Sequence, residues 1–508
     1  MNPTILCKTK KGNTYLYNFN LNQFVLVHPV MVHLLGLAKS GANLADWLEK
    51  CPAEGIELEN YGRFGREEVA YYYRKYLLFD RNNLFSEMEK GEKLSGRISK
   101  EDVSSILSNV NDVVFETTDG CNLNCKYCAF GEYYGNYDKR EKKYLDFSMA
   151  QKMLDFLLDF WQSPLNRSHK AKINIGFYGG EPLMNVDLMK KVVDYIKRKE
   201  LRNSFVFRLT TNALLVERNM DFLVENDFGM LISLDGDKEN NGYRVFHDGS
   251  EAHEEILKNV LALKNRYPTY FERKVSFNTV LHNKNSVEGV YRYFKKNFDK
   301  IPLISEVSPI GIRHDKKEEF LNIYRNTEES LALAKDPMAL EKEIFQRLSS
   351  IRGLCSIINQ YSGCCYTDYS GLLYSTKDVK RIPTGTCLPF SKKLFLSVNG
   401  KIMPCERIGH QYYYGMVDEQ GVHLDAGEVA QKANHYFDKI RHKCTTCYKA
   451  DLCSVCIYNL KLDGATELNT CPEFMNHEGF SRYQASWLSK LEEHPEYYPR
   501  IMDEVYIS

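Results

Sequence analysis

The segment VVFETTDGCNLNCKYC, residues 113–128, joins a short apolar run to a loop that carries three cysteines. The run VVFET has the length and the β-branched and aromatic content of a buried strand. The loop spaces Cys121, Cys125 and Cys128 as C-x3-C-x2-C. Three thiols cannot all pair as disulfides, and three thiolates are one short of a complete four-coordinate zinc site. The segment therefore predicts a strand followed at its carboxyl end by an incomplete metal site.

Five further apolar runs follow this strand, and helical segments separate them. The runs are INIGFY, SFVFRLT, MLISL, KVSFNTVL and LISEVS, and VDLMKKVVDYIKRK is one of the helical segments between them. Because crossover connections are right-handed, this alternation predicts an α/β fold with a parallel sheet, most simply a partial (β/α)6 TIM barrel over residues 108–310. In barrels the active site lies in loops at the carboxyl ends of the strands, where the three cysteines are expected.

A length of 508 residues predicts about two to four domains. The hydrophobic content of 43% is typical of globular proteins. Lys plus Arg equals Asp plus Glu at 67 each, so the zero formal net charge gives no support to a nucleic-acid or membrane partner. The start of the chain has no apolar stretch of signal-peptide length, and no stretch approaches ~18 uninterrupted apolar residues. We therefore expect a cytoplasmic protein, in which 15 cysteines indicate metal or redox chemistry before disulfides.

The spacing of the three-cysteine loop leaves several interpretations open. Three thiolates from one tight loop suit a [4Fe-4S] cluster whose fourth iron is free to bind a non-protein ligand. A zinc site completed by a distant residue, or cysteines that only pack in a core, are the alternatives. The spacing favours the cluster.

With Tyr127 before its last cysteine, the loop resembles the signature of the radical S-adenosylmethionine superfamily, which has an aromatic residue in that place. The resemblance implies that the open iron binds the amino and carboxylate groups of S-adenosylmethionine. It also implies that an electron from the cluster cleaves the sulfonium and yields a 5′-deoxyadenosyl radical, which abstracts hydrogen.

Three later strand ends resemble cofactor-binding segments of the same superfamily. In GFYGGEPL (176–183) two glycines permit close backbone approach, and a carboxylate is able to accept from the ammonium group of the cofactor. LTTNA (209–213) and ISLDG (232–236) end the third and fourth strands, where polar residues also serve simply to satisfy the backbone. Arg244 is expected at the surface, with contact to the carboxylate of the cofactor as the alternative. The predicted cofactor-binding residues are Gly179, Gly180, Glu181, Pro182, Asn212 and Ser233.

A second cysteine-rich pattern occupies residues 381–508. CLPFSKKLFLSVNGKIMPC (387–405) reads C-x12-G-x4-C, CTTCYKADLCSVC (444–456) reads C-x2-C-x5-C-x2-C, and Cys471 follows. The pattern resembles the SPASM domain of radical enzymes that modify peptides, with one departure, x2 rather than x3 before Cys456. Two zinc sites are the alternative, because C-x2-C pairs also bind zinc.

The SPASM resemblance implies two auxiliary [4Fe-4S] clusters, and thus three clusters in all. A fully ligated outer cluster would be held by Cys444, Cys447, Cys453 and Cys471. The inner one would be held by Cys387, Cys405 and Cys456, with a fourth ligand from Cys364, Cys365 or Cys355, or with a position left open for substrate. Glu406 follows Cys405 directly and is the predicted catalytic base, with an ordinary surface or supporting glutamate as the alternative.

The first 95 residues are predicted to form a separate module. TILCKTKKGNTYLYN reads as a hairpin, and FVLVHPVMVHLLGLAKSG, ANLADWLEK and EEVAYYYRKYLLFD read as three helices. This is the outline of a small winged-helix domain, which commonly binds DNA. It also resembles the recognition element of ribosomal-peptide maturases, in which a leader peptide adds as a strand beside the hairpin. Residues 311–380 are expected to form a helical bridge.

Taken together, the resemblance implies a radical enzyme that oxidatively modifies a ribosomally synthesised precursor peptide, most closely a thioether-forming maturase. Its partners would be the precursor peptide and an electron donor such as ferredoxin or flavodoxin. The alternatives are a maturase that forms carbon–carbon or other cross-links, and one that forms formylglycine in sulfatases. An alternative from a different class of protein is an iron–sulfur electron carrier without catalytic activity.

Overall fold

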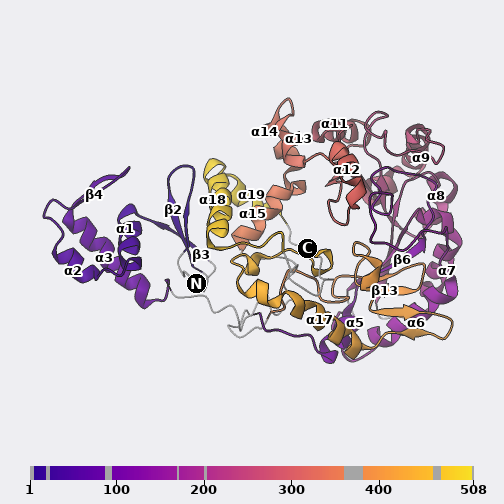
Figure 1. Ribbon diagram of the computed structural model, residues 1–508. Coiled ribbons are helices and arrows are strands. Elements are labelled where there is room, and N and C mark those ends of the chain that lie inside the picture. Colours follow the sequence, from indigo (N-terminus) through magenta and orange to yellow (C-terminus); the bar gives the residue numbers. More distant parts are fainter. Residues whose placement is uncertain are drawn as a thin grey trace.

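The computed structural model describes residues 5–18, 23–85, 94–168, 171–199, 203–359, 381–460 and 471–505. Figure 1 shows an N-terminal module at the left and a large sheet with its helices at the right. Helices α15 (Ser349–Asn359), α18 (His477–Glu493) and α19 (Tyr497–Glu504) lie between the two. In the described part of the chain, no helix has the length and apolar content needed to cross a membrane.

The large sheet begins with six parallel strands that neighbour one another in chain order. They are β6 (Asp112–Thr118), β7 (Lys172–Gly179), β8 (Ser204–Thr211), β9 (Gly229–Ser233), β10 (Val275–Leu281) and β11 (Leu303–Glu306). The helices that connect and cover them are α5 (Lys100–Asn109), α6 (Phe147–Trp161), α7 (Val186–Lys197), α8 (Val216–Glu225), α9 (His253–Arg266), α10 (Pro268–Lys274) and α11 (Val287–Phe298). The predicted α/β class and the six parallel strands are confirmed.

The two faces of these strands differ in polarity. The face under the helices buries alternate residues such as Phe115, Phe177 and Phe277, each at most 1% exposed. The opposite face carries polar side chains, of which Arg208 and Ser276 are exposed. Alternation with a period of two places these sets on opposite faces of each strand. One face of the sheet is therefore packed, and the other is accessible and polar at β8 and β10 but buried at β6, where Glu116 is 2% exposed.

The C-terminal part of the chain extends the same sheet beyond β6. Strand β12 (Leu394–Leu396) pairs in parallel with β6, and β13 (Lys401–Met403), β14 (Gly415–Val417) and β15 (Val422–His423) follow in antiparallel order. Helix α17 (Ala426–Thr445) packs against α5. Glu116 on β6 accepts from Val398 N at 2.9 Å, which fastens the β12–β13 turn to the first parallel strand.

The bridge predicted for residues 311–380 is helical in its described part. It contains α12 (Lys317–Ile323), α13 (Thr327–Ala332), α14 (Pro337–Ile344) and α15. Short 3-10 turns occur at Pro182–Asn185, His314–Lys316, Phe345–Arg347, His410–Tyr412, Ala450–Leu452 and Ile457–Asn459.

The N-terminal module contains a three-stranded antiparallel sheet rather than a hairpin alone. Its elements are β1 (Ile5–Lys8), β2 (Thr14–Asn18), β3 (Gln23–Val27), α1 (Pro29–Lys39), α2 (Leu44–Glu49), β4 (Ile56–Leu58), β5 (Gly62–Phe64) and α3 (Arg66–Arg81). The prediction of one apolar helix from Phe24 to Gly41 is wrong, because its first residues pair with β2. Pro29 sets the first helical position and His28 caps it.

This module is packed against the C-terminal region through β1 and β2. Tyr17 is 2% exposed and meets the ring of Phe480 on α18 edge-on at 5.6 Å. Ser481 Oγ donates to Leu6 O at 2.6 Å, and Lys10 N donates to Ser489 Oγ at 3.0 Å. The same apolar cluster includes Tyr448 and Leu452, which lie between two cysteines of the tail. The N-terminal sheet is thus part of the core that supports the tail.

Replacing Tyr17 by alanine is expected to destabilise this contact by about 3–5 kcal/mol, the usual cost of removing a large buried aromatic side chain. Chemical denaturation should show an earlier first transition, and limited proteolysis should release the N-terminal module faster. Tyr71, which is 52% exposed, is the matched control, and Tyr71→Ala should leave both measurements unchanged. Equal behaviour of the two variants would contradict the packing role of Tyr17.

Candidate active site at the three-cysteine loop

The three-cysteine loop leaves the carboxyl end of β6, as predicted. The pKa of the Cys121 thiol is raised to about 11 and that of Cys125 to about 12, chiefly by burial, and the charge of Cys128 contributes in the same direction. The thiols are therefore close enough to influence one another, and all three are free. Thiols held neutral by burial become thiolates when a metal binds them.

This donor set fits an iron–sulfur cluster. Thiolates are the soft ligands that such clusters use, and each thiolate of a cube binds its own iron rather than one shared ion. Within the described ranges, no group of three or more His, Cys, Asp or Glu side chains is arranged to hold a single metal ion.

The glycines of GGEP pack directly against the start of this loop. Gly180 N donates to Thr118 O at 2.8 Å, and Glu181 N donates to Gly120 O at 3.0 Å. A Cβ built on Gly180 would lie 1.7 Å from Gly120 O, and Gly179 has φ +125°, which favours glycine. The close approach that these glycines allow is thus an approach to the backbone of the three-cysteine loop.

Glu181 is buried and is bonded by three protein donors. Its carboxylate accepts from Leu183 N at 3.1 Å, Thr211 Oγ1 at 2.7 Å and Asn212 N at 2.7 Å. Burial raises the pKa of Glu181 to about 7, although these hydrogen bonds act in the opposite direction. Pro182 begins the short turn that Glu181 caps. Glu181 therefore ties the end of β7 to the end of β8, and its contact with the cofactor stays a prediction.

Asn212 lies beside the first cysteine. Its Nδ2 donates to Asn122 Oδ1 at 2.7 Å and lies 3.7 Å from Cys121 Sγ. Ser233 ends β9 on the accessible face, in register with Asn278 of β10. Two of the predicted cofactor residues, Glu181 and Asn212, thus meet next to Cys121, while Ser233 lies one strand beyond Asn212.

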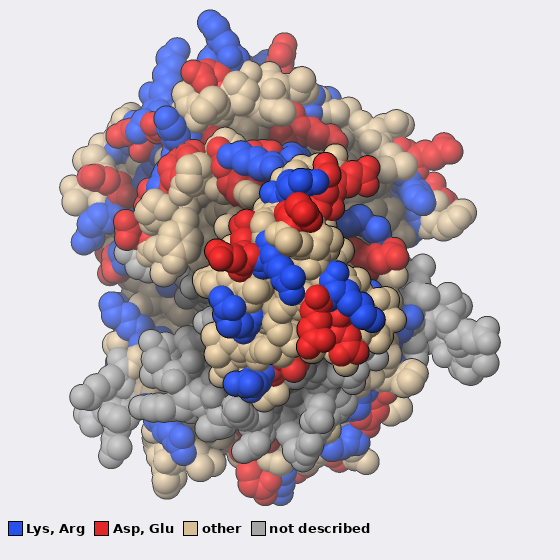
Figure 2. Space-filling view, turned by 90° about the vertical axis from the view of Figure 1, so that its left-hand side faces the viewer, with Lys and Arg blue, Asp and Glu red and all other residues tan. Residues whose placement is uncertain are grey.

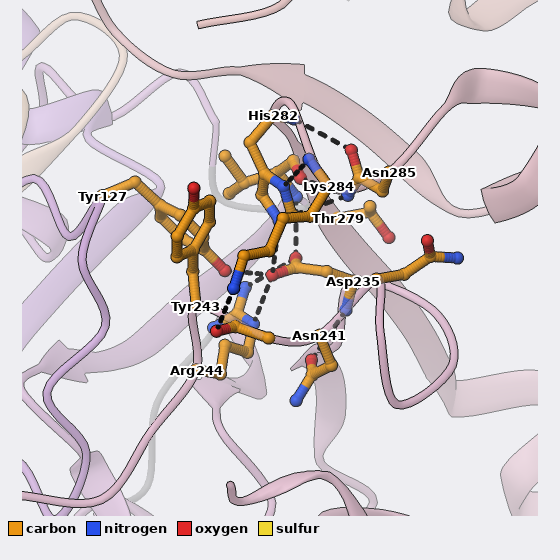
Figure 3. A network of polar contacts seen from close by, with 12 residues as sticks. Tyr127, Asp235, Asn241, Tyr243, Arg244, Thr279, His282, Lys284 and Asn285 are labelled. Atoms are coloured by element: carbon orange, nitrogen blue, oxygen red, sulfur yellow. Dashed lines mark hydrogen bonds and ion pairs between the residues drawn. The ribbon is translucent and has the colours of Figure 1, made fainter. Parts of the chain in front are cut away.

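A buried polar network that the sequence analysis missed lies on the other side of the loop (Figure 3). Asp235, from the ISLDG motif, is fully buried and pairs with Arg244 at 3.0 Å. The expectation that Arg244 lies at the surface is wrong, since it is only 6% exposed. His282, at the end of β10, lies 3.7 Å from the same carboxylate. Asp235 belongs to the ISLDG motif, but nothing in the sequence indicated that it contacts Arg244 and His282.

Two of the four cysteines predicted for the outer cluster are in backbone contact in the tail. Cys444 lies in the last turn of α17, and Cys447 N donates to Cys444 O at 3.1 Å. The pKa of Cys444 is raised to about 12, chiefly by burial, and the charges of Cys453, Cys447 and Cys471 contribute in the same direction. The part of these four thiols in metal binding stays a prediction.

The segments that carry two of the inner-cluster cysteines run side by side. Gly385 N donates to Val455 O at 3.1 Å, and Ile457 N donates to Thr386 Oγ1 at 2.7 Å. Cys387 and Cys456 therefore follow neighbouring stretches of chain. The predicted upstream ligands Cys364 and Cys365 lie outside the described residues, whereas Cys355 is buried in the apolar cluster around α15.

Glu406 is held in an ion pair. Lys393 Nζ lies 3.0 and 3.1 Å from its two carboxylate oxygens, and Cys405 Sγ lies 3.6 Å from one of them. Burial disfavours the charged form, but Lys393 outweighs it and holds the pKa of Glu406 below its usual range. The pKa of Tyr178 on β7 is raised chiefly by burial, and the charges of Glu406 and Cys128 contribute in the same direction. The role of Glu406 as a base stays a prediction.

Gly180→Ala is expected to displace the three-cysteine loop, because the added Cβ would overlap a backbone oxygen that cannot move independently. After anaerobic reconstitution the variant should bind less iron and sulfide than the parent. Gly36 on α1 has no atom within 4 Å of an added Cβ, so Gly36→Ala is the control. Unchanged iron uptake in Gly180→Ala would contradict the steric interpretation.

Comparison with known proteins agrees with this geometry. Residues 115–296 match the Radical SAM superfamily. An uncharacterized protein of Methanocaldococcus jannaschii is 29% identical over 227 residues, 44% of this chain and 70% of the relative. The radical SAM cyclopropyl synthase TigE of Paramaledivibacter caminithermalis is 23% identical over 257 residues, 49% of this chain and 50% of TigE.

Two solved structures share the fold. The structure of a histidine-tagged form of anSMEcpe with bound AdoMet has a TM-score of 0.51 at 21% identity, covering 77% of this chain and 94% of that chain. Native anSMEcpe with bound AdoMet and Cp18Cys peptide has a TM-score of 0.50 at 20% identity, covering 77% and 98%. Family match, fold and loop geometry agree, and residues 115–296 of this chain form a Radical SAM superfamily domain.

Proposed function

We propose that this protein is a radical S-adenosylmethionine enzyme that oxidatively modifies a ribosomally synthesised precursor peptide, with thioether links between a cysteine sulfur and a peptide carbon as the product. The observation that carries the proposal is a loop with three cysteines at the carboxyl ends of parallel strands, with Asn212 beside Cys121 and Glu181 bonded to Asn212. This is the edge of an α/β sheet at which ligands and reactions are found.

Cys121, Cys125 and Cys128 would hold a [4Fe-4S] cluster, which supplies the electron that cleaves S-adenosylmethionine. Around it, Asn212 orients the first residues of the cysteine loop through Asn122, and Glu181 fixes the two strand ends against each other. Ser233 offers its hydroxyl on the accessible face. Cys444, Cys447, Cys453 and Cys471, and separately Cys387, Cys405 and Cys456, would hold the two auxiliary clusters.

The accessible face of the sheet supports a peptide as substrate. It presents Arg208, Thr210, Ser276 and Asn278, whose side chains offer donors and acceptors to a peptide backbone. One comparison points the same way, because anSMEcpe was solved with a bound peptide. TigE is named as a cyclopropyl synthase. The name of TigE also keeps carbon–carbon bond formation as the second candidate.

The N-terminal module supports recognition of a leader peptide. Strand β1 packs along α18, whereas β3 is the outer strand on the other side of the sheet and exposes 59% of Leu26. An outer strand accepts a further strand through its backbone groups. On the face shown in Figure 2, Lys and Arg alternate with Asp and Glu and form no single basic patch, which disfavours DNA as the ligand.

Turnover also needs an electron source, for which we propose reduced ferredoxin or flavodoxin in the cytoplasm. In thioether formation the peptide carbon would lose one hydrogen atom and the cysteine thiol one proton, for which Glu406 is the candidate acceptor. One electron would leave as the bond between sulfur and carbon forms, and a cluster held by the tail cysteines would supply the acceptor for it.

Incubation of the reduced, reconstituted protein with S-adenosylmethionine should release 5′-deoxyadenosine, and co-expression with the precursor peptide should lower the mass of that peptide by about two hydrogens per link. Cys121→Ala, Cys125→Ala and Cys128→Ala should each abolish both results. Cys51 is buried in the N-terminal module, and Cys51→Ala is the control that should retain them.

The same experiment separates the two chemical steps. Glu406→Gln should still release 5′-deoxyadenosine while peptide modification slows by about 10²-fold, the lower end of the range for a lost general base. A parent protein that binds iron but never releases 5′-deoxyadenosine would exclude the enzyme and favour an electron carrier. An unchanged peptide mass with active cofactor cleavage would exclude the cross-linking reaction.

Leader binding is tested at the outer strand. Leu26→Glu should weaken binding of the leader peptide about tenfold or more in a fluorescence anisotropy titration, because burying a charge in a strand interface is unfavourable. Leu321 on α12 is 58% exposed and provides the control, since Leu321→Glu adds the same charge far along the chain from β3. Equal affinity of the Leu26→Glu variant and the parent would remove β3 as the docking strand.

A further inference from the structure

Tyr127 is a residue of the three-cysteine loop whose side chain is buried and ends in a polar group. It lies between Cys125 and Cys128 in sequence, is 6% exposed, and its hydroxyl donates to Asp235 Oδ2. Figure 3 shows the tyrosine pointing toward the carboxylate of Asp235, with Arg244 and His282 around it. A phenol that reaches a fixed acceptor restrains the backbone on either side of it, and here both sides carry a cysteine.

The acceptor is itself rigidly held. Arg244 donates to both oxygens of Asp235, from Nε at 3.0 Å and from Nη2 at 3.1 Å, and Val280 N donates to Oδ1 at 2.9 Å. Burial opposes ionisation, but Arg244 and His282 outweigh it and hold the pKa of Asp235 below its usual value. The acceptor of the Tyr127 hydroxyl is therefore a carboxylate, and hydrogen bonds to charged acceptors are about twice as strong as neutral ones.

The network also holds the segment that runs beside the loop. Asn124 N donates to Val245 O at 2.8 Å, and Lys126 N donates to Tyr243 O at 3.1 Å, on either side of Arg244. The guanidinium carbon of Arg244 lies 5.4 Å from the centroid of the Tyr127 ring, which stacks on His282 at 5.5 Å. Asp235 thus fixes the loop through Tyr127 and the neighbouring segment through Arg244.

We propose that Asp235 is a positioning residue for the three-cysteine loop, and that its hydrogen bond from Tyr127 sets how Cys125 and Cys128 are presented to the cluster. Apolar packing alone would bury the ring of Tyr127 without fixing the position of its hydroxyl group. The ion-paired carboxylate of Asp235 fixes that position, because it accepts the hydrogen bond from the hydroxyl. The purpose of this positioning rests on the proposed function. The anchoring itself does not, because it involves contacts of the protein alone.

The test uses Tyr127→Phe, which keeps the ring on His282 and the Asp235–Arg244 pair but removes the hydroxyl. Hydrogen–deuterium exchange of the full-length protein under anaerobic conditions should be at least about 10-fold faster at the amides of Asn124 and Lys126, as expected from the loss of a charge-assisted bond. Tyr243→Phe is the matched control, because that hydroxyl donates to Asn283 and not to Asp235. It should leave these two amides within about twofold of the parent.

A spectroscopic measurement separates positioning from packing. In the reconstituted and reduced protein, the electron paramagnetic resonance signal with and without S-adenosylmethionine should differ between the parent and Tyr127→Phe, and not between the parent and Tyr243→Phe. A ring needed only for packing would give the parent signal in both variants, and that result overturns the proposal.

The exchange experiment has equally clear contrary outcomes. Parent-like exchange in Tyr127→Phe, or equal acceleration in both variants, overturns the anchoring role of Asp235. If the parent protein takes up no iron on reconstitution, the proposed function fails. Hydrogen–deuterium exchange at Asn124 and Lys126 still decides in that case whether Asp235 anchors the loop.

Discussion

The contact between Gly180 and Gly120 is the constraint on which the rest of the site depends. Parallel pairing of β6 with β7 brings the carboxyl ends of the two strands to one edge of the sheet. The loops that follow the two strands are therefore in direct contact. The backbones approach so closely that a Cβ at Gly180 would lie 1.7 Å from Gly120 O. Only glycine fits there, so the path of the three-cysteine loop is set by backbone against backbone.

From that contact, two sets of polar groups hold the loop from opposite sides. Glu181 and Asn212 stand next to Cys121, and the Asp235 network stands next to Cys125 and Tyr127. Both sets come from strand ends and are buried, so each depends on hydrogen bonds that replace those lost to water. Contacts of the protein alone thereby hold the loop in place.

The tail is paired with the large sheet, and the N-terminal module is packed on the tail and on α18. Strand β12 extends the sheet at β6, and Asp138, shortly after the three-cysteine loop, pairs with Lys401 at 2.7 Å and His410 at 3.2 Å. The N-terminal sheet in turn packs on residues between Cys447 and Cys453. Peptide recognition, if it occurs at β3, therefore takes place on a module that shares a core with the tail.

The sequence by itself determined the parallel strands, their order and the loop that carries the cysteines, because hydrophobic runs and ligand spacing are local in the chain. It did not determine β3, since its apolar residues satisfy a helix pattern equally well and only pairing with β2 decides between them. It also missed the burial of Arg244, whose charge is paired with a carboxylate nine residues earlier and lies near the ring of a tyrosine from another loop. Tyr127 and Asp235 are 108 residues apart, and only the tertiary structure decided that they meet, because that contact follows from strand order and loop packing rather than from any local pattern.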